Sequence, residues 1–214
     1  MSRYDTSSLP EAQFEPGSRG RVLRNRLGIR SKRVMNALER DEQVRAVEEL
    51  SDLFDSDHRF TAADIRTIHK VWLGGIYDWA GNYRQVNVSK GNFHFAAAAQ
   101  IPKLMAEFER KELSEFTPCR FASIKEVVEA LAVVHTEMVL IHPFREGNGR
   151  AARLLSVLMG LQAGLPPLDF NGIAGRKKED YIAAVQAGMV RDYQPMRAVF
   201  ASVIRRTLRY RVPR

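Results

Sequence analysis

Cysteine is nearly absent from this sequence, since Cys119 is the only one in 214 residues. A single cysteine excludes an internal disulfide framework and a metal site built from several thiolates. The neighbouring residues in "FTPCRFAS" supply no base that would activate a nucleophile. We therefore interpret Cys119 as a small apolar residue.

Long apolar runs are also absent. No stretch approaches the roughly 18 apolar residues that a membrane span requires. Arginine, aspartate and glutamate interrupt the first twenty residues, where a signal peptide would be continuously apolar. We expect a cytoplasmic protein with no membrane partner, and translocation into a host cell is the alternative. A polar N-terminal tail, residues 1–20, should be loosely ordered and precede a single domain, residues 21–214.

Basic residues outnumber acidic ones, and the formal charge is +8. This excess attracts anionic partners without selecting one. Most of it gathers near the two ends, in residues 18–33 and 203–214. The sequence has no recognisable nucleic-acid reader motif, so nucleic acid is a disfavoured partner. A nucleic-acid binder remains an alternative, and its affinity would fall steeply with salt.

Helical spacing of apolar residues dominates the chain and indicates an all-α fold. The first helical pattern starts from Ser31, and Thr61 is suited to cap the second helix. The buried face of the first helix should carry Val34, Leu38, Val44, Val47 and Leu50, and that of the second Ile65, Ile68, His69 and Trp72. His69 is accordingly predicted to be a packed core histidine.

One segment, residues 83–98, breaks the helical pattern with alternating apolar residues around the turn-prone "SKGN". It predicts a β-hairpin that lies on the helical body, because an isolated hairpin is marginal in water. Its edge could accept another chain, or the hairpin could be a plain connection.

Two strongly apolar helices follow, and a short polar loop joins them. The first, beginning near Ser123, should end at His142, because Pro143 disfavours helical geometry in the residue before it. The second should end near Gly164. The loop and its flanks, "HPFREGNGRAAR", residues 142–153, therefore lie between two buried elements.

The chemistry of this loop points to phosphate. Gly147, Asn148 and Gly149 would open the second helix, where free backbone N–H groups and the positive end of the helix dipole favour an anion. The Asn148 amide can donate, and Arg150 and Arg153 lie one turn apart. Forked guanidinium groups beside a helix N-terminus suit a polyphosphate.

Two further residues of the loop add catalytic chemistry. Glu146 can hold Mg²⁺ together with phosphate oxygens, although a lone glutamate could instead pair with an arginine. His142 can take a proton at physiological pH, although a histidine before a proline is often structural. The gathering of base, carboxylate, anion nest and arginines within twelve residues favours catalysis.

This loop resembles the defining motif of the Fic family, His-x-Phe-x-Asp/Glu-Gly-Asn-Gly-Arg-x-x-Arg, without a departure. The resemblance extends to "RNRLGI" near the start, to residues 76–96 and to residues 178–196. It implies the all-α Fic fold, a helical bundle with a β-hairpin flap beside the active-site loop. It also implies transfer of AMP from ATP to a Ser, Thr or Tyr hydroxyl of a target protein.

The resemblance also implies the role of each residue. His142 matches the general base, Phe144 the anchor of the loop, and Glu146 the Mg²⁺ ligand. The remaining motif residues match the nucleotide-binding groups: Gly147, Asn148 and Gly149 around the α-phosphate, and Arg150 and Arg153 on the β- and γ-phosphates. Val88, Ser89 and Lys90 match the flap that pairs with the target by strand addition.

Gly147 bears on the reaction, because relatives of the Doc type carry lysine there and phosphorylate their targets. Glycine favours AMP transfer. Transfer of UMP, phosphocholine or phosphate, and a non-catalytic Fic-fold binding module, remain alternatives. Tyr181 could line the base pocket or belong to the core.

Many members of the family restrain themselves with a helix that bears Ser/Thr-x-x-x-Glu-Gly/Asn. In this sequence the only glutamate followed by Gly or Asn is Glu146, inside the motif itself. The nearest approach, Ser7 to Glu11, is followed by Ala12. The resemblance therefore implies a toxin-like member whose inhibitory glutamate comes from a separate small antitoxin, or one regulated by delivery.

Overall fold

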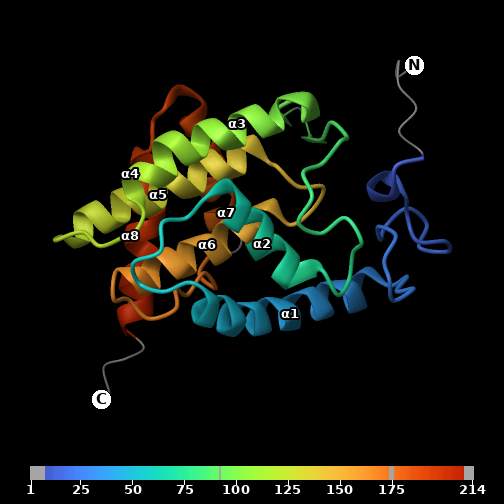
Figure 1. Cartoon of the computed structure of the whole chain (residues 1–214), viewed down its shortest axis with the longest axis horizontal. Coiled ribbons are helices and arrows are strands. Elements are labelled where there is room, and N and C mark those ends of the chain that lie inside the picture. The colour runs from blue at the N-terminus through green and yellow to red at the C-terminus, as the bar shows by residue number, and fades with distance from the viewer. Residues whose placement is uncertain (1–7, 92, 174–175, 210–214) are drawn as a thin grey trace.

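The computed structural model describes residues 8–91, 93–173 and 176–209. The regular secondary-structure elements in this part of the chain are helices, apart from one small hairpin (Figure 1). The predicted all-α class with a β-hairpin is therefore confirmed. The longer helices are α1 (Lys32–Leu53), α2 (Ala62–Leu73), α3 (Ile101–Phe108), α5 (Ile124–Ile141), α6 (Asn148–Gln162), α7 (Arg176–Ala187) and α8 (Gln194–Arg209). A π-helical turn, Glu109–Leu113, continues α3 into the short α4 (Ser114–Phe116).

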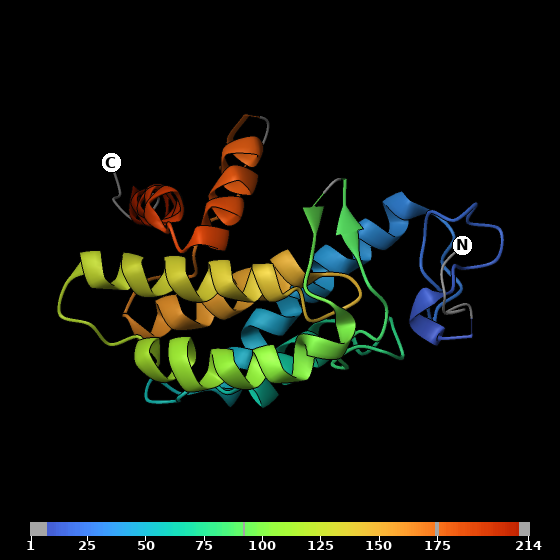
Figure 2. The ribbon, with the colours of Figure 1, turned by 90° about the horizontal axis from the view of Figure 1, so that it is seen from above.

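Helices α5 and α6 lie together at the centre of the fold, and the other helices pack around them (Figure 1). Helix α1 contacts α2 and α6, while α8 contacts α5 and α7. Seen from above, the hairpin and α7 project to the same side of the α5–α6 pair (Figure 2). No helix in the described ranges is long and apolar enough to cross a membrane.

Local capping signals fix where the helices begin. The Ser31 side chain accepts a hydrogen bond from the Val34 N–H and caps α1. Thr61 with Asp64, and Ser123 with Glu126, form reciprocal capping boxes at the starts of α2 and α5. The predicted cap at Thr61 is confirmed.

The buried face of α1 differs from the predicted one. Val34 and Val44 are 49% and 67% exposed, whereas the buried residues of the helix are Met35, Glu39, Ala46 and Leu50. A charged residue, Glu39, therefore lies where an apolar residue is expected. Glu39 lies on the buried face because its carboxylate pairs with Arg150 of α6.

The hairpin predicted around "SKGN" is present, but its strands are shorter than the alternating pattern of residues 83–98 indicated. Strand β1 (Ser89–Lys90) pairs antiparallel with β2 (Phe93–His94), with Ser89 opposite His94 and Lys90 opposite Phe93. A hydrogen bond from the Phe95 N–H to the Val88 carbonyl extends the pairing by one residue.

Residues 8–20, which we expected to be loosely ordered, instead pack on the hairpin base. A 3₁₀ turn, η1 (Pro10–Ala12), buries Glu11 to 6% exposure. The Glu11 carboxylate accepts hydrogen bonds from the N–H groups of Gln85 and Val86, at 2.6 and 3.1 Å. These two backbone donors supply hydrogen bonds that the carboxylate would otherwise lose when it is buried. Residues 1–7 of the predicted tail lie outside the described ranges.

Two histidines lie in the core and have no contact with solvent water. His69 on α2 and His135 on α5 are 0% and 1% exposed. The ring nitrogens of His135 lie 3.2 Å from Ser156 Oγ and 2.7 Å from Tyr181 Oη. Burial lowers the pKa of His69 to about 4 and the pKa of His135 to about 3. Burial likewise raises the pKa of the Cys119 thiol to about 12, so this thiol is inert at neutral pH.

These two histidines make the fold sensitive to mild acid. Their pKa values are lower in the folded than in the unfolded chain, so the unfolded chain takes up protons first as the pH falls through about 6.5. We expect the free energy of unfolding to fall by roughly 2 kcal/mol per histidine between pH 7 and pH 5. Denaturant unfolding at both pH values measures it.

The His135→Gln variant keeps a polar side chain at this position and removes the titration, so its pH dependence should be smaller by roughly 2 kcal/mol. His94→Gln, at an exposed position on the hairpin, is the matched histidine substitution outside the core. An unchanged pH dependence in His135→Gln would contradict the assignment.

Candidate active site

The polar loop between α5 and α6 begins at His142, which terminates α5 in a left-handed conformation with φ of 54°. Its Nδ1 lies 3.0 Å from the Val139 carbonyl, and its ring stacks on Phe95 from the hairpin with centroids 3.6 Å apart. A carbonyl only accepts, so Nδ1 carries the proton and Nε2 presents a lone pair. Burial lowers the pKa of His142 to about 4, which keeps the ring neutral at pH 7.

Arg84 joins this histidine to the hairpin. Its side chain is 1% exposed and donates to three carbonyls: His142 at 2.7 Å, Val86 at 2.7 Å and Ala96 at 2.5 Å. Its backbone N–H donates to the Pro143 carbonyl at 2.9 Å. Arg84 thus holds the segment before β1 and the segment after β2 against the loop. The sequence pattern did not reveal this residue, because a lone arginine beside a strand is ordinarily exposed.

His69, on α2, contacts the motif loop and supports it. Its Nδ1 accepts a hydrogen bond from the Gly81 N–H at 2.9 Å, so Nε2 carries the proton and donates to the Glu146 carbonyl at 3.1 Å. Its ring stacks on Phe144, with centroids 3.8 Å apart. Phe144 is fully buried, which suits an anchor of the loop. His69 is a packed core histidine, as predicted, and it also fixes the motif backbone.

The Asn148 side chain differs in placement from the expectation. It is 2% exposed, and its amide exchanges two hydrogen bonds of 2.8 Å with the backbone N–H and carbonyl of Phe144. The amide therefore braces the loop instead of reaching toward an anion. The backbone N–H groups of Asn148 and Gly149, at the start of α6, have no hydrogen-bond partner in the described part of the chain. These two donors are what the helix N-terminus offers to an anion.

The two motif glycines have different surroundings. Gly147 adopts φ of 81°, and a Cβ at this position would lie 2.8 Å from Cζ3 of the buried Trp72. A Cβ on Gly149 would meet nothing closer than Tyr181 Oη, at 3.9 Å. Gly147 is thus required by backbone conformation and packing. Only Gly149 leaves open space over the helix N-terminus.

Arg150 is held by a buried carboxylate. Its Nη1 lies 2.6 Å from Oε2 of Glu39, which has no solvent exposure and also accepts a hydrogen bond from the Tyr77 hydroxyl at 2.8 Å. The Arg150 guanidinium lies 4.7 Å over the Trp72 ring, and its Nη2 lies 3.5 Å from Oε1 of Glu146. The charge of Arg150 is therefore already paired, and its position is fixed from α1.

Arg153, one turn further along α6, has a different environment. Its guanidinium lies over the rings of Tyr181 and Phe170, at 5.5 and 5.7 Å. It forms no ion pair with any described residue, and its Nε is buried without a hydrogen-bond partner. Tyr181 bonds to His135 and is 9% exposed, so it belongs to the core, and its ring also contacts Arg153. A partly buried cation that has no counter-charge among the described residues favours an anion beside it.

The carboxylate of Glu146 lies at the rim of the loop, where its side chain is 41% exposed. Within the described ranges no group of three or more His, Cys, Asp or Glu residues could hold a metal ion. Mg²⁺ is commonly bound by one carboxylate together with substrate phosphates. Glu146 fits that mode, in which the ion binds together with a nucleotide.

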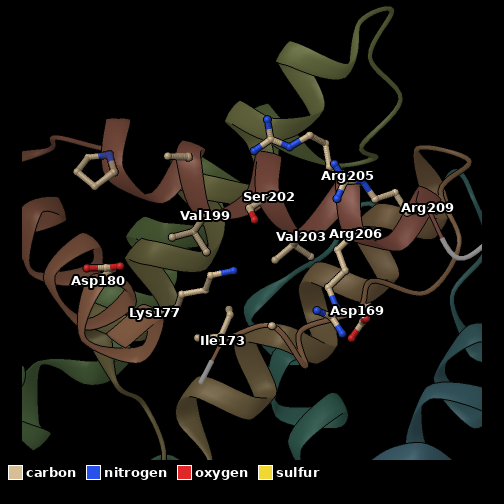
Figure 3. A pocket seen from close by; sticks show the side chains of 13 residues that line it. Asp169, Ile173, Lys177, Asp180, Val199, Ser202, Val203, Arg205, Arg206 and Arg209 are labelled. Carbon is tan, nitrogen blue, oxygen red and sulfur yellow. Dashed lines mark hydrogen bonds and ion pairs between the residues drawn. The ribbon is translucent and has the colours of Figure 1, made fainter. Parts of the chain in front are cut away.

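A cavity lies elsewhere in the described structure. It has a volume of about 660 Å³ and lies between α7, α8 and the segment before α7 (Figure 3). Lys177, Arg205, Arg206 and Arg209 line it, together with Asp169 and Asp180. No residue of the 142–153 motif lines this cavity, so the chemistry of the motif, not cavity size, locates the candidate active site.

The contrast between the two glycines is testable by stability. Gly147→Ala should lower the free energy of unfolding by about 2–4 kcal/mol, from the left-handed backbone and the clash with Trp72. Gly149→Ala is the matched control, and its stability should change by less than about 1 kcal/mol. Denaturant titration compares them, and equal stabilities would show that Trp72 yields to the added methyl group.

Comparison with known proteins agrees with this geometry. The sequence matches the model of the Fic/DOC family over residues 59–159. A protein from Escherichia coli K12 named "probable protein adenylyltransferase Fic" is 31% identical over 190 residues, covering 86% of this chain and 88% of that protein. Protein adenylyltransferase VbhT from Bartonella schoenbuchensis is 30% identical, covering 77% of this chain and 33% of VbhT.

Solved structures give the same result. The BepC protein of Bartonella tribocorum, crystallised with AMPPNP, matches with a TM-score of 0.67 and 25% identity, covering 85% of this chain and 91% of BepC. The N-terminal Fic domain of a VirB-translocated Bep effector from Bartonella quintana, with bound ADP, matches with a TM-score of 0.68 and 26% identity, covering 85% and 89%. The motif, the fold and these relatives together show that the chain belongs to the Fic/DOC family.

Proposed function

We propose that this protein transfers AMP from ATP to a Ser, Thr or Tyr hydroxyl of a target protein. The observation that carries the proposal is the juxtaposition within one loop of a neutral histidine with a free Nε2, a helix N-terminus with unpartnered N–H groups, and Arg153 without a counter-charge. Relatives named protein adenylyltransferases support the same reaction class.

His142 acts as the general base in this proposal. Its Nε2 takes the proton of the target hydroxyl, whose oxygen then forms a bond to the α-phosphorus of ATP. The bond between the α-phosphorus and the bridging oxygen breaks, and pyrophosphate leaves. The unpartnered N–H groups of Asn148 and Gly149 stabilise charge on the α-phosphate oxygens.

Arg150 and Arg153 both bind the β- and γ-phosphates in this proposal, but they contribute differently. Arg150 contributes from a position fixed by Glu39, and it also orients the Glu146 carboxylate. Arg153 supplies the uncompensated charge that a polyphosphate would neutralise. Glu146 would hold Mg²⁺, which when bound supplies positive charge beside the phosphate oxygens.

Val88, Ser89 and Lys90 form the docking flap in this proposal, to which a target segment adds as a strand. The flap is tied to His142 through Arg84, so a segment paired with it would be placed relative to the base. Gly147 favours AMP transfer over phosphorylation, because the buried Trp72 ring leaves no room for the lysine of the phosphorylating relatives.

A separate small antitoxin is the regulator we propose. The sequence carries no inhibitory motif of its own, and Arg153 has no carboxylate partner in the described structure. A glutamate from another chain could pair with Arg153 and displace the γ-phosphate. The cytoplasm is the proposed site of action, and delivery into a host cell is the alternative that the translocated Bartonella relatives suggest.

Labelled ATP tests the reaction. The purified protein is incubated with Mg²⁺, a bacterial lysate and ATP labelled at the α or the γ position. We expect label in protein from the α position only, and a decrease of about 100-fold or more in His142→Ala, because general-base catalysis contributes about 10² to 10⁴. Transfer from the γ position would identify a kinase. α-Label that persists in His142→Ala would exclude His142 as the base.

A second prediction separates the two arginines. Arg153→Gln should weaken ATP binding about tenfold or more, and the free energy of unfolding should change by less than about 1 kcal/mol, because no ion pair is lost. Arg150→Gln should instead cost about 3–5 kcal/mol of stability, because it leaves the Glu39 carboxylate buried and unpaired. Calorimetric ATP titration and denaturant unfolding of both variants measure this. Equal loss of stability in the two would contradict the division of roles.

A further inference from the structure

A groove of about 380 Å³ runs beside the flap, and none of the nucleotide-binding residues lines it. Its walls are Ala12 from η1, residues 86–89 on the approach to β1, and Arg145 from the motif loop. Three segments that are far apart in the sequence thus meet here. Figure 2 shows the hairpin beside the coil at the start of the chain.

One wall of this groove is an open strand edge. The Phe95 N–H donates to the Val88 carbonyl, and Ser89 lies opposite His94. Backbone groups of successive strand residues point to opposite sides, so those of Ser89 and Asn87 point away from β2. A peptide added in extended form would pair with this side of the flap, and its side chains would lie against the groove.

The other walls are fixed before any partner arrives. The Glu11 carboxylate holds the N–H groups of Gln85 and Val86, and the Glu11 carbonyl accepts a hydrogen bond of 2.9 Å from Arg145 Nε. Arg84 holds the Val86 carbonyl from the opposite side. A groove with rigid walls loses little conformational entropy on binding.

The charge in the groove is positive. Arg145 forms no ion pair within the described ranges, and its one hydrogen bond there uses Nε alone. No acidic side chain is among the lining residues, and the nearby Glu11 carboxylate is turned to backbone N–H groups. A guanidinium whose terminal nitrogens are unpaired suits a carboxylate, which it can bind with two parallel hydrogen bonds.

We propose that Arg145 recognises an aspartate or glutamate of the target segment that adds to the flap, and so makes the protein selective for acidic acceptor sites. This inference rests on the proposed function. Arg145 follows His142 by three residues in one rigid loop, so the acidic residue lies within a few residues of the modified hydroxyl. The N-terminal turn, through Glu11, is then part of the target-docking surface.

Oriented peptide libraries with a central Ser, Thr or Tyr test the inference. Sublibraries carry Asp, Asn or Lys at one flanking position at a time, and transfer from α-labelled ATP is measured for each. The wild type should prefer Asp over Asn by about tenfold at one or two positions, which is the strength of a charge-assisted hydrogen bond. Arg145→Lys should keep the preference for Asp, and Arg145→Glu should shift it to Lys at the same positions.

Lys103→Glu on α3 is the matched control. It makes the same change in net charge at an exposed site that does not line the groove. ATP binding and thermal stability of each variant show that the rest of the protein is intact. Equal transfer to Asp, Asn and Lys sublibraries, or an Asp preference unchanged in Arg145→Glu, would overturn the inference.

A failure of the proposed transfer reaction can be distinguished from a failure of recognition by Arg145. If no sublibrary is labelled, binding of the same fluorescent peptides to wild type and Arg145→Glu is measured by anisotropy. Acidic peptides that bind the wild type preferentially, with the preference reversed in the variant, would uphold recognition by Arg145 while the proposed transfer fails. Peptide binding without charge preference, or no binding, would overturn the recognition itself.

Discussion

The buried guanidinium of Arg84 is the contact on which the arrangement of the site depends. A cation removed from water is costly unless its donors are satisfied, and here the acceptors are three backbone carbonyls from the catalytic loop and the two sides of the hairpin. Separating the hairpin from the motif loop would remove one of these acceptors, the His142 carbonyl. The Arg84 charge also adds to burial in lowering the pKa of His142.

His69 and His142 show how hydrogen-bond partners assign different roles to the same side chain. His69 accepts from a backbone N–H, so its proton is fixed on Nε2 and used to hold the Glu146 carbonyl. His142 donates from Nδ1 to a carbonyl, which leaves Nε2 free to accept. Burial keeps both rings neutral. The first is a structural donor, and the second has the form that a general base requires.

Features encoded by neighbouring residues could be predicted from the sequence. The cap at Thr61, the turn of the hairpin and the end of α5 before Pro143 each depend on residues a few positions apart. The motif loop followed from the same kind of local signal. The loop lies between α5 and α6, as expected.

Features that depend on distant partners could not be predicted. Glu39 and Arg150 are 111 positions apart, and nothing beside Glu39 in the sequence distinguishes it from the exposed glutamates of α1. Val34 and Val44 were assigned to the core for the same reason, because apolar spacing does not register a buried carboxylate. The Asn148 amide was assigned to an anion because its composition allows it, whereas its bonds to Phe144 depend on the shape of the loop.

The pairing of charges explains why two arginines one turn apart differ. Folding satisfies Arg150 through Glu39, so its contribution to the site is a fixed position. Folding leaves Arg153 over two aromatic rings, with no carboxylate partner among the described residues and with a buried Nε that lacks a hydrogen-bond partner, which is unfavourable in the free protein. An anion bound at the start of α6 would supply the missing partner. A polyphosphate and an inhibitory carboxylate would therefore compete for the same group.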